Sequence, residues 1–273
     1  MSRRVVVTGM GVISPVGNTV ASFWDSIKNG RSGTGPVTRF DAAKYISRVA
    51  AEVKEFNPEP VISAKEVNKT DLFCQYAVVS AVEAVENAGL NNGSIDLDRV
   101  GVIIGSGIGG ITTLEAQKEN LMNKGPRRIS PHLIPMMIVN MASGLVSMRY
   151  GFHGPNTSVV TACATANHSI GEAMRIIQND EADVMVAGGT EAALTPLGFG
   201  GFCAMRALTG HNDDPETASR PFEKTRDGFI MGEGAGVVVL EELEHAQKRG
   251  AAIYAELVGF GMSGDAHHVT MPR

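Results

Sequence analysis

The sequence predicts an α/β fold in which helices cover both faces of a buried sheet. Runs of apolar, mostly β-branched residues occur at 4–8, 99–104, 182–187 and 235–240, and several of them run directly into glycine. Continuous apolar runs of this length are typical of strands that are buried on both faces. Segments with helical periodicity lie between them, and this alternation indicates an α/β domain.

Glycine and capping residues set the expected limits of the elements. Gly9 and Gly11 predict the end of the first strand, and Gly30 closes the short helix that follows. In chain order we expect a strand at 4–8, a helix at 23–28, an irregular surface segment at 32–60, a helix at 70–88, a strand at 99–104, a helix ending near 123, a strand at 157–161, a helix at 164–178, strands at 182–187 and 235–240, a helix at 241–249 and a strand at 252–261.

The helix expected at 70–88 has the clearest pattern in the chain. Thr70 or Asp71 can cap its start, and Gly89 can stop it. Its apolar positions recur at helical spacing, which leaves Glu83 and Glu86 to face water.

Composition excludes several classes of protein. The net charge of −5 argues against a nucleic-acid-binding protein. The three cysteines are widely separated and form no C-x-x-C pair, so neither a disulfide framework nor a zinc site is indicated, and a reducing cytoplasm fits this usage. Residues 129–148 carry no charged side chain, but two prolines and several polar residues argue against a membrane span.

Cys163 is the most informative residue of the sequence. The expected buried strand at 157–161 stops just before it, and the expected helix at 164–178 starts just after it. Unpaired amides and the dipole at a helix N-terminus favour an anion, and the thiolate is the nucleophilic form of cysteine. The same amides could hold a developing oxyanion. The alternative is a buried structural cysteine that behaves as a small hydrophobic residue.

A glycine-rich turn offers a competing site. Gly105, Gly107 and Gly110 match the G-x-G-x-x-G pattern of a dinucleotide-binding turn between a strand and a helix. A Rossmann unit also needs a second strand ending in an acidic residue about twenty positions on. Residues 122–128 provide neither the strand nor the acid. Close packing of strand, helix and partner backbone is the alternative explanation of these glycines.

Several motifs together resemble the β-ketoacyl-acyl-carrier-protein synthases, and the similarity is strongest to the type II, elongating enzymes. They are RRVVVTGMG at 3–11, SPVG at 14–17, GSGIGG at 105–110, TACAT at 161–165, ADVMVAGGT at 182–190, SRPF at 219–222 and DGFIMGEGAG at 227–236. The resemblance extends over essentially the whole chain, and its motifs are highly specific.

The resemblance implies a thiolase-like layered α/β sandwich built of two similar halves, normally as a homodimer and without a cofactor or metal. Residues 1–250 would form the N-terminal half, and residues 251–273 would begin the C-terminal half with its first strand. Cys163 would take an acyl group from acyl-carrier protein. Condensation with malonyl-carrier protein, with loss of CO₂, would then give a 3-oxoacyl chain two carbons longer.

Further site residues follow from the resemblance by position. Ile108 and Phe202 would line the acyl channel, and Leu133 would close the channel of a partner subunit; for Ile108 and Phe202 ordinary core packing is the alternative. Residues 262–272 resemble a mobile gate over the entrance, with Asp265, His268 and Thr270 as its named residues. Basic residues at carrier-protein docking positions are Lys65, Lys69, Arg127, Arg128 and Arg206, for which a solvated surface is the alternative.

The histidines depart from the family pattern. The family uses two histidines and a lysine for decarboxylation and condensation, in motifs that would follow residue 273. The sequence contains His132, His153, His168, His211, His245, His267 and His268, none of them in those motifs. The sequence therefore predicts the nucleophile-bearing half of a condensing enzyme. The alternatives are a catalytically incomplete carrier-protein-binding module and a polyketide-type ketosynthase.

Overall fold

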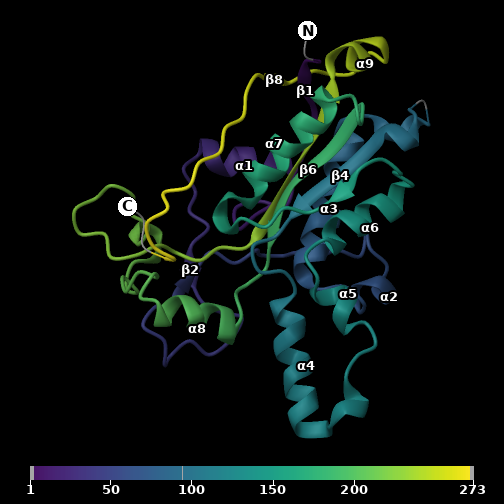
Figure 1. The fold of residues 1–273 in the computed structure, drawn as a ribbon. Coiled ribbons are helices and arrows are strands. Elements are labelled where there is room, and N and C mark those ends of the chain that lie inside the picture. Colours follow the sequence, from purple (N-terminus) through teal and green to yellow (C-terminus); the bar gives the residue numbers. More distant parts are fainter. Residues whose placement is uncertain (1–2, 94, 271–273) are drawn as a thin grey trace.

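The computed structural model describes residues 3–93 and 95–270, and its centre is one mixed six-stranded sheet (Figure 1). The strands lie in the order β5-β4-β6-β7-β1-β8. β4 runs parallel to β5 and to β6, whereas the pairs β6–β7, β7–β1 and β1–β8 are antiparallel. The bounds are β1 Val5–Ile13, β4 Val100–Gly105, β5 Asn156–Thr157, β6 Val184–Glu191, β7 Gly234–Glu242 and β8 Ala255–Leu257; β2 Gly35–Pro36 and β3 Val49–Ala50 form a separate small pair.

Helices cover both faces of the sheet, as the sequence predicts. α3 and α6 pack on one face, and α7 packs on the other. The helix bounds are α1 Val20–Lys28, α2 Ala64–Val67, α3 Leu72–Asn87, α4 Ile111–Lys124, α5 Leu133–Met137, α6 Met141–Tyr150, α7 Thr165–Gln178, α8 Pro196–Ala204 and α9 Leu243–Lys248. The α/β class is thereby confirmed.

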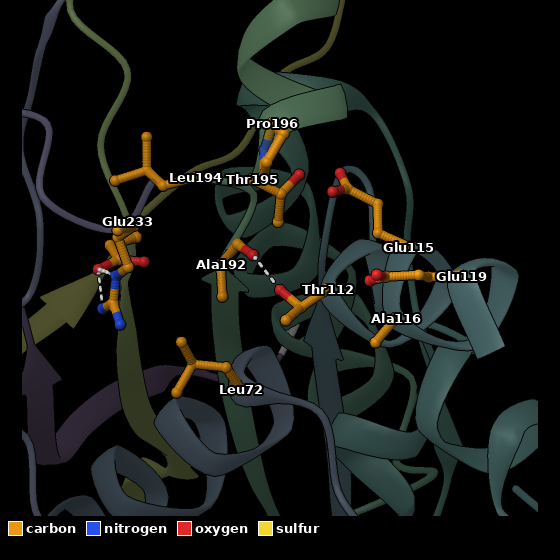
Figure 2. Close-up of a pocket in the computed structure, with 11 residues that line it drawn as sticks. Leu72, Thr112, Glu115, Ala116, Glu119, Ala192, Leu194, Thr195, Pro196 and Glu233 are labelled. Carbon is orange, nitrogen blue, oxygen red and sulfur yellow. Dashed lines mark hydrogen bonds and ion pairs between the residues drawn. The ribbon is translucent and has the colours of Figure 1, made fainter. Parts of the chain in front are cut away.

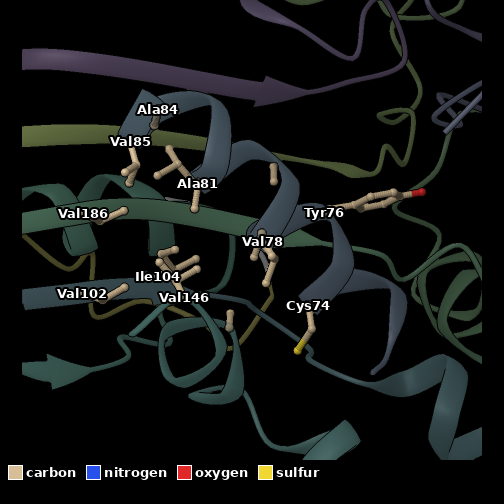
Figure 3. Packing of buried hydrophobic residues seen from close by; sticks show 14 of the residues in the cluster. Cys74, Tyr76, Val78, Ala81, Ala84, Val85, Val102, Ile104, Val146 and Val186 are labelled. Carbon is tan, nitrogen blue, oxygen red and sulfur yellow. The ribbon is translucent and has the colours of Figure 1, made fainter. Parts of the chain in front are cut away.

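Each face of the sheet has its own apolar core. Beneath α3 and α6, small and β-branched side chains such as Val85 and Ala81 pack against Val102 and Val186 of the strands (Figure 3). On the other face, Ile177 of α7 belongs to a second cluster that includes side chains of β4, β6 and β7. The apolar strand runs are therefore buried on both sides, because each face of the sheet carries a helix.

The first strand does not end at its glycines. β1 continues through Gly9 and Gly11 to Ile13, and a Cβ atom at Gly11 would lie 1.9 Å from the backbone oxygen of Ser80 in α3. These glycines therefore allow helix and strand backbones to approach each other closely, rather than ending the strand as predicted.

Glu83 of α3 is a second correction. Its carboxylate accepts hydrogen bonds from Val12 N (2.9 Å) and from Val20 N (2.7 Å) at the start of α1, instead of facing water. Glu86 is exposed as expected, and Asp71 caps α3 by accepting from Phe73 N at 3.3 Å.

The prediction of a buried strand at 157–161 is wrong in two respects. Only Asn156–Thr157 pairs with β4, and most of the residues up to 161 are exposed. β5 is the edge strand of the sheet, so its residues pair on one side only. The strand expected at 252–261 is also shorter and consists of β8 alone. Helices α5, α6 and α8 were not expected from the sequence.

Candidate active site

Cys163 lies on a short 3₁₀ turn, Ala162–Ala164, that leads directly into α7, and its side chain is exposed. No side chain of the described residues caps the start of α7. The amides of Ala164 and Thr165, which follow the thiol, donate to the backbone oxygens of Thr161 and Ala162 within the turn. The predicted position of Cys163 before a helix is correct, although a regular buried strand does not precede it.

Small residues place this turn on the sheet. A Cβ atom at Gly105 of β4 would lie 2.3 Å from Thr165 Cγ2, and one at Gly189 of β6 would lie 2.7 Å from Ala166 Cβ. The first turn of α7 can therefore lie directly on β4 and β6. Thr161 N donates to Thr165 Oγ1 at 2.8 Å, which ties the turn to the helix.

Ala162 holds the backbone in an unusual conformation just before the thiol. Its φ angle is +50°, in the left-handed region that residues with a Cβ atom rarely adopt. Such strain persists only where the surroundings determine it, and it is common at functional sites.

The glycine-rich loop at 105–110 is occupied by a carboxylate of the chain itself. Glu191, the last residue of β6, accepts hydrogen bonds from Gly107 N (2.8 Å), Ile108 N (3.2 Å) and Ser106 Oγ (2.9 Å). A carboxyl group of the chain thus already accepts from the amides that a dinucleotide phosphate would need. This arrangement favours the packing explanation of the glycines over the dinucleotide-binding one.

The predicted channel residues do not lie in one cluster. Ile108 is 39% exposed and follows Gly107, at which a Cβ atom would lie 3.5 Å from Ala162 Cα. Leu133 begins α5 and is half-buried, and Gly110 N donates to Met137 O of that helix at 3.2 Å. Phe202 belongs to a separate apolar cluster beneath α8 and contacts the ring of Phe229 edge-on.

The predicted docking residues are all exposed and lie on three segments. Lys65 and Lys69 lie in and just after α2, Arg127 and Arg128 lie on a 3₁₀ turn after α4, and Arg206 follows α8. Their exposure agrees with docking and equally with a solvated surface.

The predicted gate residues Asp265, His268 and Thr270 are exposed and lie outside helices and strands. Thr270 N donates to His268 Nδ1 at 3.2 Å. Met271 and Pro272 of the predicted gate, and the end of the predicted 251–273 segment, lie outside the described residues.

The segment just before this predicted gate packs across α7. Phe260 contacts the ring of His168 edge-on, and the guanidinium of Arg175 lies 5.1 Å from the centre of the Phe260 ring. His168 therefore packs against the segment that precedes the predicted gate.

A cavity of 380 Å³ lies away from Cys163, between α4 and the segment leading into α8 (Figure 2). Arg39 pairs with the buried carboxylate of Glu233 on one side, and Glu115 and Glu119 of α4 lie on the other. Arg39 also donates to Tyr76 Oη at 3.0 Å. The pairing of Arg39 with Glu233 has no local sequence signal, because 194 positions separate the two residues.

Within residues 3–93 and 95–270, no cluster of histidine, cysteine and acidic side chains is suited to hold a metal ion. No helix in the same ranges has the length and apolar character needed to cross a membrane.

Relatives in sequence carry consistent names. The chain is 56% identical over 270 residues to 3-oxoacyl-[acyl-carrier-protein] synthase 2 of Coxiella burnetii and 51% identical over 270 residues to the protein of that name from Synechocystis. Each match covers 99% of this chain and 65% of the relative. The chain thus spans about 65% of the length of the curated relatives that it matches.

Solved structures of similar fold are ketosynthases. A beta-ketoacyl synthase from Burkholderia phymatum has a TM-score of 0.89 at 31% identity, and the match covers 99% of this chain and 66% of that one. The ishigamide ketosynthase/chain length factor has a TM-score of 0.88 at 35% identity, with coverage of 98% and 65%. A type II PKS acyl-carrier protein in complex with its ketosynthase has a TM-score of 0.86 at 33% identity, with coverage of 99% and 65%.

These neighbours confirm the predicted thiolase-like α/β class. A family model described as "Beta-ketoacyl synthase, N-terminal domain" matches residues 2–246. The chain therefore belongs to the beta-ketoacyl synthase family and carries the N-terminal domain of that family.

Proposed function

We propose that the chain carries the nucleophile of a 3-oxoacyl-acyl-carrier-protein synthase that elongates fatty acids. The observation that carries the proposal is the exposed thiol of Cys163 on a strained turn at the start of α7, where the helix has no side-chain cap. An exposed nucleophile beside oriented amides suits acyl transfer, since the amides can stabilise charge on the thioester oxygen.

The proposed first half-reaction is acylation of Cys163. The thiolate attacks the carbonyl carbon of the acyl-carrier thioester, so that a new C–S bond forms. The bond to the carrier sulfur then breaks, and the carrier leaves as a thiolate that takes up a proton. The amide of Cys163 itself is one proposed oxyanion donor.

The proposed second half-reaction is condensation. Malonyl-carrier protein loses CO₂, and the resulting carbanion attacks the carbonyl carbon of the acyl-Cys163 thioester. The C–S bond breaks, which releases the Cys163 thiolate and the 3-oxoacyl-carrier product. The step needs no oxidant or reductant, in agreement with the expected absence of a cofactor, which stays a prediction.

The relatives favour a role in fatty-acid synthesis over one in polyketide synthesis. Those named 3-oxoacyl-[acyl-carrier-protein] synthase 2 are 51–56% identical to this chain, whereas the complex named for a type II PKS is 33% identical. The proposed partners are acyl- and malonyl-carrier protein and a second copy of the chain, and the proposed compartment is the cytoplasm. The division at residue 250 likewise stays a prediction.

The roles of the other site residues are part of the proposal. Ile108 and Phe202 are proposed to line the acyl channel, and Leu133 is proposed to close the channel of a partner subunit. Asp265, His268 and Thr270 are proposed to lie on its gate. The exposed residues Lys65, Lys69, Arg127, Arg128 and Arg206 are proposed to attract an acidic carrier protein, because complementary charge accelerates association.

The test separates acylation from condensation. We expect incubation with acyl-carrier protein to add one acyl group to Cys163, detected by peptide mass, and Cys163→Ala to abolish the addition. We expect little 3-oxoacyl product when malonyl-carrier protein is added, because the family places its proton-transfer histidines in motifs that this sequence lacks. One missing oxyanion donor typically costs about 10²–10³ in rate, and a missing acid–base group costs about 10²–10⁴.

The full-length relative from Coxiella burnetii is the positive control. No acylation of Cys163 would refute the proposed nucleophile. Carrier-protein binding without acylation would support the alternative of a binding module. Condensation at the rate of the relative would show that the acid–base groups lie within these 273 residues.

A further inference from the structure

We propose that Glu191 is a positioning residue for Cys163, acting through the glycine-rich loop at 105–110. The inference rests on the proposed function only in taking Cys163 as the nucleophile. It assigns to Glu191 the task of holding the backbone that borders the reactive turn.

The first step is the set of contacts that Glu191 makes. One carboxylate oxygen accepts from the amides of Gly107 and Ile108, and the other accepts from Ser106 Oγ. Ser106 Oγ in turn accepts from Gly109 N at 2.9 Å. A single side chain from β6 therefore organises, directly or through one hydroxyl, three amides of the loop.

The second step is the contact between the loop and the reactive turn. A Cβ atom at Gly107 would lie 3.5 Å from Ala162 Cα and 3.6 Å from Ala162 O. The backbone of Gly107 thus packs closely against Ala162, the residue that precedes Cys163. Ala162 is the residue with the strained φ of +50°, and strain of this kind relaxes when its surroundings give way.

The third step is the anchoring of the far end of the loop. A Cβ atom at Gly110 would lie 2.2 Å from Met136 O, and Gly110 N donates to Met137 O at 3.2 Å. The loop is therefore held by β4 and by α5 at its two ends and by Glu191 between them. Loss of the Glu191 contacts leaves the backbone next to Ala162 without its side-chain acceptor, while the two ends stay in place.

A carboxylate suits this task because all three direct partners donate to it. An ionised carboxylate only accepts, whereas the glutamine side chain offers one accepting oxygen and an NH₂ group that donates. In Glu191→Gln, the oxygen can still accept from the two amides, but the NH₂ group then faces Ser106 Oγ, so that the hydroxyl must accept this bond and its hydrogen loses the acceptor that Glu191 provided. Burial raises the pKa of Glu191, and the hydrogen bonds from Ser106, Gly107 and Ile108 oppose that effect.

Glu52 provides a matched control. Its buried carboxylate likewise accepts from one hydroxyl and two successive amides: the hydroxyl of Thr38 and the amides of Thr38 and Arg39. Glu52 has no contact with the loop at 105–110 among its hydrogen bonds in the described structure. Glu52→Gln therefore reproduces the chemical change without touching the surroundings of Cys163.

The experiment measures the rate constant for alkylation of Cys163 by iodoacetamide in the 273-residue chain, together with the thermal midpoint of each variant. We expect Glu191→Gln to lower the rate by about tenfold, which corresponds to about 1.4 kcal/mol. Glu52→Gln should leave the rate within twofold of the parent, even where it lowers the thermal midpoint by the same amount.

Ser106→Ala is the second variant, in case Glu191→Gln does not fold. It removes the hydroxyl that links Glu191 to Gly109, keeps the carboxylate, and should lower the rate about threefold. An unchanged or increased rate in both folded variants would overturn the inference, as would an equal fall in Glu52→Gln. Failure of Cys163 to react in the parent would instead refute the proposed function, so the two failures are distinguishable.

Discussion

The three cysteines differ in how far their thiols are exposed to solvent. Cys163 is exposed on its turn, whereas Cys74 of α3 and Cys203 of α8 are buried. Burial, together with the nearby charge of Asp71, raises the pKa of Cys74. A buried thiol with a raised pKa is neither accessible nor ionised at neutral pH.

Limited labelling of the folded protein with iodoacetamide should therefore modify Cys163 first. We expect Cys74 and Cys203 to react only after unfolding in urea. Peptide mapping after short exposure measures the three sites in one sample. Equal labelling of all three cysteines in the folded state would contradict the assignment of Cys163 as the reactive thiol.

At the scale of the elements, the packing of α3 on β1 depends on glycine. Gly11→Ala would place its Cβ atom 1.9 Å from Ser80 O, a backbone atom that cannot move without displacing the helix. We expect the free energy of unfolding to fall by about 3 kcal/mol, at the upper end of the usual cost of overpacking. Urea denaturation followed by circular dichroism measures the change.

Gly236→Ala is the control for this substitution. Gly236 lies on the adjacent strand β7, and no atom lies within 4 Å of a Cβ atom built there. Its replacement should change the unfolding free energy by less than about 1 kcal/mol. A similar loss in both variants would show that strand glycines matter here for their flexibility and not for close approach.

An ion cluster ties the starts of three strands together. Asp183, just before β6, accepts from Arg99 Nε and Nη2 at 3.0 Å each and also from Arg3. Hydrogen bonds from Arg99 and then from Arg3 lower the pKa of Asp183 from 3.8 to about 2, although burial opposes them. Because the pKa is lower in the folded state, the ion cluster stabilises the fold above about pH 4, and this contribution is lost as the pH falls towards 2.

Asp183→Asn should therefore reduce the free energy of unfolding by about 2 kcal/mol at pH 7, and by progressively less between pH 4 and pH 2. Urea titrations at pH 7 and at pH 2.5 give the difference. Asp98→Asn, at an exposed position one residue before Arg99, is the control and should change stability little at either pH. A pH-independent loss in Asp183→Asn would assign the effect to packing rather than to charge.

At the scale of the whole molecule, one edge of the sheet is open and apolar. β5 is the end strand, and the residue Val160 that follows it is 53% exposed. Ile134 of α5 and Met148 of α6 are 58% and 68% exposed. Exposed apolar groups beside an open edge strand are typical of an association surface.

We expect light scattering at micromolar concentration to give twice the chain mass of 28.8 kDa. Val160→Lys should shift the protein towards the monomer, since it places a charge at the proposed interface. Val258→Lys, at an exposed valine beyond the opposite edge strand β8, should leave the dimer intact. A monomeric parent protein would contradict the proposed homodimer.

Patterns within short stretches of the sequence determined much of this protein. Continuous apolar runs located β1, β4, β6 and β7, and helical patterns located α3, α4 and α7 to within a few residues. Cys163 could be chosen for its place before a helix, and the motifs around it were specific to one family, which the comparisons confirmed. These features are local, because the spacing of apolar residues that marks a strand or a helix involves only residues close together in the sequence.

Only the tertiary structure decided which distant residues meet. It showed that residues 158–161 follow an exposed edge strand, because an apolar run does not specify whether a second element covers it. It showed that Gly9 and Gly11 face α3, and that Glu191 holds a loop 83 to 85 positions earlier in the chain. Glu191 directly follows the 182–190 motif and was visible in the sequence, but its partners depend on how β4 and β6 pair. The reason is physical: a short-range pattern sets the conformation of a segment, whereas the partners of its side chains depend on contacts between segments that only the folded chain brings together.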